Sequence, residues 1–235
     1  MKKFCTLLLV ILGVLLCAGG ALAASEKDVL RLDEEDILNN RDGKQVSFSM
    51  MSSRNTKEIF IDEEAIDYLI KNHLDLTIKT PKVTMSVPSR VFQVPEWDAA
   101  VKTGEPVTAK LILAKGNLSK VADNFDEWYY NQIGFYRLNN VAYELKAEIL
   151  VAGVKKYELA ELAAPLALEV NYPANSVTAF VREDRLGCYF LNEDSGKWIY
   201  AGGEVNPEAN IINCSVSQTG LFTFCSDNRQ ESSSA

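Results

Sequence analysis

Few residues of this sequence have the types and spacing that catalysis or metal binding requires. The 235-residue chain has a single histidine, His73, which excludes a multi-histidine metal site, and no Gly-x-Ser-x-Gly elbow presents a nucleophile to it. The sequence also has no phosphate-binding glycine loop, CxxC pair or HExxH motif. A glycosidase needs only two carboxylates at a defined separation, and 32 Asp and Glu residues do not exclude such a pair. Acids are abundant on any soluble surface, however, so their number is weak evidence for one. We therefore expect a protein that is not an enzyme and that uses no cofactor and no metal.

A cluster of aromatic residues raises an alternative, which is carbohydrate binding. The cluster consists of Trp128, Tyr129, Tyr130 and Tyr136. Exposed rings can stack on sugars, although aromatic side chains more often pack in cores and on sheet faces. Coplanar, exposed rings would favour a carbohydrate-binding module, whereas buried rings would favour a structural role.

The first 23 residues have the layout of a secretory signal peptide. Lys2 and Lys3 precede an apolar run over residues 6–16, and small residues follow up to Ala23. The apolar run is shorter than the roughly 20 residues that a membrane-spanning helix needs. No second stretch approaches that length, so we expect cleavage near Ala23 and an exported chain without a transmembrane segment.

Lipid attachment and charge further limit where the chain goes and what it binds. Leu16 precedes Cys17, where lipid-modified precursors usually carry a small residue, so a lipoprotein anchored through Cys17 is not expected. The chain is thus expected to be secreted or held at the cell surface. Its 24 Lys and Arg residues against 32 acids give a net charge of −8, which argues against nucleic acid as a partner.

Changes in composition divide the chain into five segments. A turn-rich stretch around the Gly-Glu-Pro sequence separates a mixed α/β part from a part dominated by strand patterns. The segments are 1–23 (signal peptide), 24–56 (acidic lead-in and first strand), 57–105 (strand–helix–strand portion), 106–226 (β-sandwich-like portion) and 227–235 (polar tail).

The clearest local pattern is a short α/β element near residues 57–87. Residues 57–61 predict a strand, and apolar residues at helical spacing predict one short helix near residues 62–73. Residues 74–78 alternate as a strand, and residues 83–87 follow a Pro-Lys turn as its hairpin partner.

The C-terminal half contains several short strands separated by turns about every ten residues. Residues 188–191 and 197–200 flank a turn-rich loop, and residues 211–216 and 221–225 flank a Gln-Thr-Gly turn, so each pair is expected to form a hairpin. We therefore predict a mainly β fold that is β-sandwich-like, with an antiparallel meander at the C-terminus and the α/β element described above.

Four residues in this half are predicted to be structural. Trp198 follows a hairpin turn and is expected to pack beneath it. Cys188, Cys214 and Cys225 alternate with apolar residues, which predicts three free, mostly buried thiols. In the expected last hairpin Cys214 lies opposite Thr223, a register that disfavours a disulfide between Cys214 and Cys225. A disulfide from Cys188 to either partner stays open.

Several of these patterns together carry a family resemblance. The segments concerned are residues 61–65 leading into 74–80, then 83–88, 189–198, 206–208 and 220–224. They resemble the β-rich extracellular modules of Gram-positive bacterial surface proteins, of the kind often found beside S-layer homology repeats. The resemblance implies a location at the cell envelope and a partner such as a cell-wall polymer or another surface protein. It transfers no active-site residue.

The leading hypothesis is therefore an exported, non-catalytic β-rich module with a structural or interaction role at the cell envelope. The alternative is a carbohydrate-binding module that uses Trp128, Tyr129, Tyr130 or Tyr136 as stacking surfaces. A glycosidase-type hydrolase is the third hypothesis, and it requires a cleft with paired carboxylates.

Overall fold

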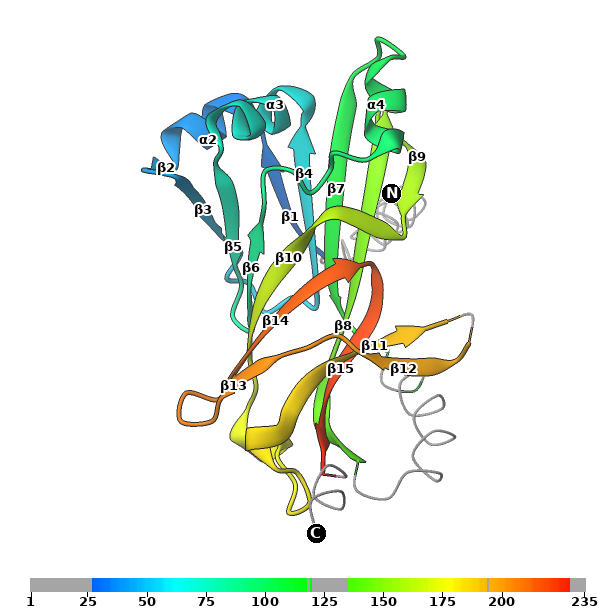
Figure 1. Ribbon diagram of the computed structural model, residues 1–235. Coiled ribbons are helices and arrows are strands. Elements are labelled where there is room, and N and C mark those ends of the chain that lie inside the picture. The colour runs from blue at the N-terminus through cyan, green and yellow to red at the C-terminus, as the bar shows by residue number, and fades with distance from the viewer. Residues whose placement is uncertain (1–26, 118, 120–134, 194, 229–235) are drawn as a thin grey trace, which may run out of the picture.

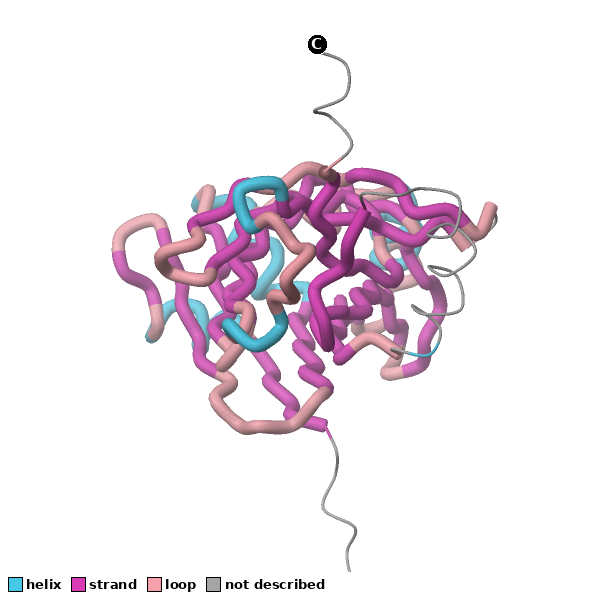
Figure 2. The backbone as a smooth tube through the Cα atoms, turned by 90° about the horizontal axis from the view of Figure 1, so that it is seen from below, coloured by secondary structure: helices cyan, strands magenta, loops and turns pink. Residues whose placement is uncertain are grey.

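The chain folds into two mixed β-sheets that pack as a sandwich-like structure (Figure 1), which confirms the predicted fold class. Strands make up most of the backbone, and short helices connect them (Figure 2). The computed structural model describes residues 27–117, 119, 135–193 and 195–228. The predicted signal peptide, Trp128, Tyr129, Tyr130 and most of the predicted polar tail lie outside the described residues.

The eight-stranded sheet is built around one long strand, β8 (Phe135–Val151), which pairs with β7, β9 and β15. β1 and β4 are parallel, and the other neighbours in this sheet are antiparallel. The order is β1 (Lys27–Leu32), β4 (Thr56–Asp62), β7 (Val107–Lys115), β8, β15 (Gly220–Asp227), β11 (Leu186–Asn192) and β12 (Lys197–Tyr200), with β9 (Val154–Leu159) off this path.

The seven-stranded sheet covers the inner face of the first. β3 and β5 are parallel, and its other neighbours are antiparallel. The predicted 57–105 and 106–226 portions both contribute strands to both sheets. The order is β13 (Glu204–Asn206), β14 (Ile211–Gln218), β10 (Glu161–Asn171), β6 (Val83–Val87), β5 (Asp75–Lys79), β3 (Gln45–Ser49) and β2 (Arg41–Asp42).

Short helices join the strands. They are α2 (Glu34–Asn39), α3 (Glu63–Asn72) and α4 (Pro95–Val101), with 3₁₀ turns η1 (Ala174–Ser176) and η2 (Glu183–Arg185). No helix of the described residues has the length and apolar content needed to cross a bilayer.

Helix α3 forms where the sequence predicts it, for local reasons. The Asp62 side chain caps the helix by accepting a hydrogen bond from the Ala65 amide at 2.8 Å. Ala65, Ile66 and Leu69 form its buried face, and His73 ends the helix in a left-handed conformation with φ of 52°. The helix carries the chain from β4 in one sheet to β5 in the other.

The main core lies between the sheets, and β15 is buried on both of its faces. Phe222 and Phe224 point into the main core, whereas Leu221 and Cys225 point to a smaller cluster on the opposite face. Trp198 is 4% exposed and belongs to that smaller cluster, as expected for a structural residue.

The predicted pairing of the last two strands is wrong. β14 and β15 belong to different sheets. The chain crosses from one sheet to the other just before Gly220, which has a φ of 134° and begins β15. Cys214 pairs with Leu168 of β10 instead of lying opposite Thr223. Cys188, Cys214 and Cys225 are nonetheless free, buried thiols, as predicted.

Candidate functional site

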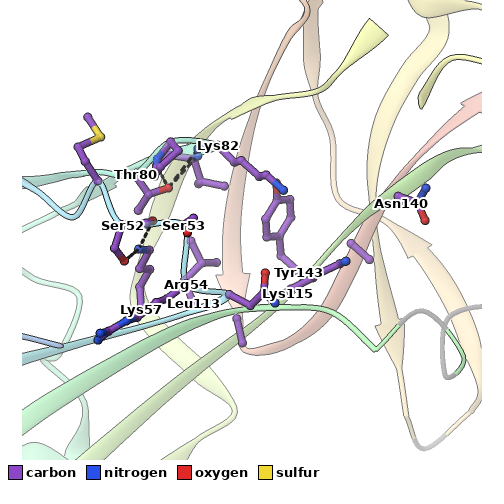
Figure 3. Close-up of a pocket in the computed structure, with 16 residues that line it drawn as sticks. Ser52, Ser53, Arg54, Lys57, Thr80, Lys82, Leu113, Lys115, Asn140 and Tyr143 are labelled. Atoms are coloured by element: carbon purple, nitrogen blue, oxygen red, sulfur yellow. Dashed lines mark hydrogen bonds between the residues drawn. The ribbon is translucent and has the colours of Figure 1, made fainter. Parts of the chain in front are cut away.

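A pocket of about 250 Å³ opens between strand ends of both sheets (Figure 3). The eight-stranded sheet contributes the start of β4, the end of β7 and the middle of β8. The seven-stranded sheet contributes the turn between β5 and β6, and the loop between β3 and β4 closes one side. The site is therefore assembled from segments that are far apart in the sequence.

The lining of this pocket is cationic, although the chain as a whole is acidic. Its charged side chains are Arg54, Lys57, Lys82 and Lys115, and none of the described residues that line it is an Asp or Glu. Low-dielectric walls strengthen the field of such a cluster. The pocket thus presents a local positive potential on an acidic protein.

Two of these lysines point inward because they continue the core-facing series of their strands. On β7 the buried Leu113 is followed at the next inward position by Lys115, and on β4 the buried Ile59 is preceded by Lys57. Lys115 lies directly opposite Tyr143 of β8 in the ladder. The inner face of this sheet therefore changes from aliphatic to polar at the pocket.

Lys57 fixes the loop that closes the pocket. The residue is 5% exposed, and its Nζ donates hydrogen bonds of 2.8 Å to Asp28 Oδ2, Ser52 O and Ser52 Oγ. Ser52 Oγ donates in turn to Asp28 Oδ2 at 2.7 Å. The hydrogen bonds from Lys57 and then Ser52 lower the pKa of Asp28. This network ties the β3–β4 loop to β1 and β4.

The contact between Ser52 and Lys57 is structural and does not activate a nucleophile. A serine–lysine pair reacts only when the amine is free to accept the hydroxyl proton. The three protons of the Lys57 ammonium are already used in three hydrogen bonds, and the Ser52 hydroxyl donates to Asp28. Neither group is placed to accept or release a proton toward a ligand.

The β5–β6 turn holds Lys82 at the opposite side of the pocket. Thr80 Oγ1 donates to the Val83 carbonyl at 2.8 Å and accepts from the Val83 amide at 3.0 Å, which closes the turn. Lys82 lies between these two residues, and its side chain extends toward Tyr143 in Figure 3. The turn thus presents an ammonium group to the mouth of the site.

Tyr143 and Asn140 of β8 supply neutral hydrogen-bond donors. Burial raises the pKa of Tyr143 to about 12, so the phenol keeps its proton at neutral pH. Its ring packs on Phe222, with 5.7 Å between ring centroids. Asn140 has a φ of 60° where the pairing of β8 with β15 shifts register, and this bulge places its side chain at the pocket.

Of the four aromatic residues proposed from the sequence, Tyr136 is the one that the structure describes. Tyr136 lies near the start of β8 and outside the pocket; it is half-buried and stacks on Phe180 with 5.4 Å between ring centroids. Phe180 is 66% exposed, and the sequence reading did not single it out. Trp128, Tyr129 and Tyr130 lie outside the described residues, so the predicted cluster stays a prediction.

Several described carboxylates in hollows and on sheet faces are held in ion pairs. On the outer face of the eight-stranded sheet, Lys110 Nζ lies 3.3 Å from Glu58 and 3.6 Å from Glu148. A second, more open hollow of about 540 Å³ includes Glu158, whose pKa is lowered by its hydrogen bond to Lys155. A glycosidase acid needs a raised pKa, so Glu158 is unsuited to that role.

The chain was compared with protein-family models and with curated proteins. No protein-family model matches the chain, and no curated protein matches it significantly. In the part of the chain that the structure describes, no group of three or more His, Cys, Asp or Glu side chains is placed to hold a metal ion. The fold and the pocket define the chain as a two-sheet, sandwich-like β protein with a cationic pocket.

Proposed function

We propose that this protein is an exported, non-catalytic binding module of the cell envelope, and that the cationic pocket is its binding site. The observation that carries the proposal is the composition of the pocket. Its described lining combines cations and neutral donors with apolar side chains such as Val83 and Leu113, and includes no carboxylate, histidine or cysteine. Such a lining can hold and orient an anionic ligand, and it offers no carboxylate or imidazole as a general base and no thiol as a nucleophile.

Export is supported by the layout of the first 23 residues, and the envelope location by the resemblance to surface modules. N-terminal sequencing of the protein recovered from medium, wall and membrane fractions tests export. A chain that starts near residue 24 supports it, whereas a chain that retains residues 6–16 contradicts it.

Binding is tested with the exported protein and cell envelopes isolated from the cells that produce it. We expect saturable co-sedimentation that the pocket variant Lys115→Gln weakens. Lys156→Gln is the matched control, because Lys156 is also an exposed lysine near a strand end but does not line the pocket. Equal binding by both variants would remove the pocket from the proposal.

The stacked pair of Tyr136 and Phe180 supports carbohydrate binding as the second candidate function. One exposed ring backed by another offers an apolar face on which a sugar can stack. Phe180→Ala should then abolish retention on a polysaccharide column and leave binding at the cationic pocket unchanged. Retention that survives this substitution would exclude the pair as the sugar site.

A further inference from the structure

We propose that the cationic pocket recognises a phosphate monoester group attached to a small organic moiety. This inference rests on the proposed function, since it names the ligand of the same site. The charge, the donors and the size of the pocket each support it.

The charge of the pocket calls for an anionic ligand. Among the described residues, Lys82 and Lys115 form no ion pair, although the structure pairs lysines elsewhere, as at Lys110 and Lys155. Lys57 is neutralised by Asp28, but the ammonium groups of Lys82 and Lys115 are not. Two cations that share one concave surface repel each other, and a bound dianion would relieve that repulsion.

The neutral donors favour a tetrahedral oxyanion over a planar carboxylate. Lys82 comes from one sheet, whereas Lys115, Tyr143 and Asn140 come from the other, so donors surround the cavity from several sides. The three terminal oxygens of a phosphate monoester can accept from separate directions, whereas a carboxylate has two oxygens in one plane. The Tyr143 phenol remains a donor across the physiological pH range.

The size and the apolar lining indicate that the phosphate carries an organic group. A volume of about 250 Å³ corresponds to roughly eight water molecules, which is more than a bare phosphate fills. Val83, Leu113 and Ala142 line the same cavity and offer apolar contacts. The size and apolar lining therefore suit a small phosphorylated unit, and a pocket of this size on an acidic chain does not suit a nucleic-acid backbone.

The first experiment titrates the exported protein with phenyl phosphate and measures binding by calorimetry and by amide chemical shifts. We expect the shifts to concentrate at residues 51–55, 80–83 and 140–143. Phenyl phosphate should bind more tightly than benzoate, and phenol should not bind. Because the second pKa of a phosphate monoester is about 6, binding should tighten between pH 5 and pH 7.

Substitutions assign the binding to the pocket. Lys82→Gln and Lys115→Gln should each weaken phenyl phosphate about tenfold, the double variant should weaken it further, and Lys156→Gln should have no effect. Lys82 and Lys115 are exposed, so the variants should keep their melting temperatures. Equal affinity for benzoate, or undiminished binding by the double variant, would overturn the inference.

A final set of binding experiments distinguishes a phosphorylated polymer from a lipid headgroup as the source of the phosphate. It also tests the phosphate inference separately from the proposed function. Binding to isolated envelopes that phosphatase treatment abolishes would indicate a phosphorylated polymer. Binding to vesicles of phosphatidic acid, but not phosphatidylcholine, would indicate a lipid headgroup. Envelope binding without phenyl phosphate binding would refute the phosphate and retain the proposed function. Phenyl phosphate binding without any envelope binding would retain the phosphate site and refute the envelope module.

Discussion

Lys57 of β4 and Asp28 of β1 form an ion pair of 2.8 Å at the end of the only parallel contact in the described part of the eight-stranded sheet. The Lys57 side chain is 6% exposed and that of Asp28 is 23% exposed. The pair therefore joins two neighbouring strands, with the lysine buried and the carboxylate partly open to solvent. It also holds Ser52, and hence the loop that closes the cationic pocket.

Removing the Asp28 charge should destabilise the protein. Asp28→Asn leaves the buried Lys57 ammonium without its carboxylate, and we expect the free energy of unfolding in urea at pH 7 to fall by about 1–3 kcal/mol. Replacing both residues, as in Asp28→Leu with Lys57→Met, should cost less, because no unpaired charge is then buried. A double variant that is less stable than Asp28→Asn would contradict this account.

The same pair predicts a pH dependence. The pKa of Asp28 is lower in the folded state than in the unfolded state, so folding stabilises the ionised carboxylate. Its contribution is complete above the unfolded pKa of about 3.9 and is lost as the pH falls through the lower folded value. The stability difference between the wild-type chain and Asp28→Asn should therefore shrink below about pH 4. A difference that persists undiminished at lower pH would refute the ion pair as its source.

Trp198 should contribute strongly to stability. Its ring is buried with Phe135, Leu191 and Leu221, so Trp198→Ala should lower the free energy of unfolding by about 3–5 kcal/mol. Tyr200→Ala is the matched control on the same strand, because Tyr200 is 60% exposed and should cost much less. Thermal unfolding of the two variants measures the difference, and equal melting temperatures would contradict the structural role.

Local signals in the sequence are sufficient for individual elements. The N-cap Asp62 and the apolar spacing of Ile66 and Leu69 predict α3, and the Pro-Lys turn predicts the antiparallel pairing of β5 with β6. These patterns depend on residues that are close together in the sequence, so the periodicity of apolar residues and the turn residues are enough to predict the elements.

Partner choice between strands could not be predicted in the same way. The Gln-Thr-Gly turn before β15 has hairpin chemistry, yet β14 pairs with β10 and β15 pairs with β8 and β11. β15 is buried on both faces, so its position is decided by contacts with strands far away in the sequence. A turn signal specifies a change of direction and does not specify the sheet that the next strand joins.

The candidate site was missed for a related reason, although part of its signal is present. Lys57 begins and Lys115 ends an otherwise apolar core-facing series, and a lysine at such a position is a reason to look for a pocket or an ion pair. Lys82 and Asn140 carry no such signal. They reach the pocket only because the two sheets pack and β8 bulges.

The three cysteines should be unreactive in the native protein. Burial raises the pKa of Cys225, and a hydrogen bond to Cys214 followed by burial raises that of Cys188. Since the thiolate is the reactive form, a thiol reagent at pH 8 should label the native chain slowly and label three thiols per chain after denaturation without reductant. One thiol after denaturation would establish a disulfide. The structure then indicates Cys188 and Cys214, which meet across the two sheets.

Two substitutions at Asn140 should distinguish its effect on the stability of the β8 bulge from its effect on ligand binding at the pocket. Its φ of 60° is adopted by glycine without strain, whereas a left-handed alanine costs about 1–2 kcal/mol. Asn140→Ala should therefore lower the free energy of unfolding by about that amount, and Asn140→Gly should stay close to the wild-type value. Both variants lose the side-chain amide, so both should bind phenyl phosphate more weakly than the wild-type chain. Urea unfolding and calorimetry on the same samples measure the two effects. If Asn140→Gly keeps full affinity, the amide does not contact the ligand, and the bulge serves only to shape the pocket.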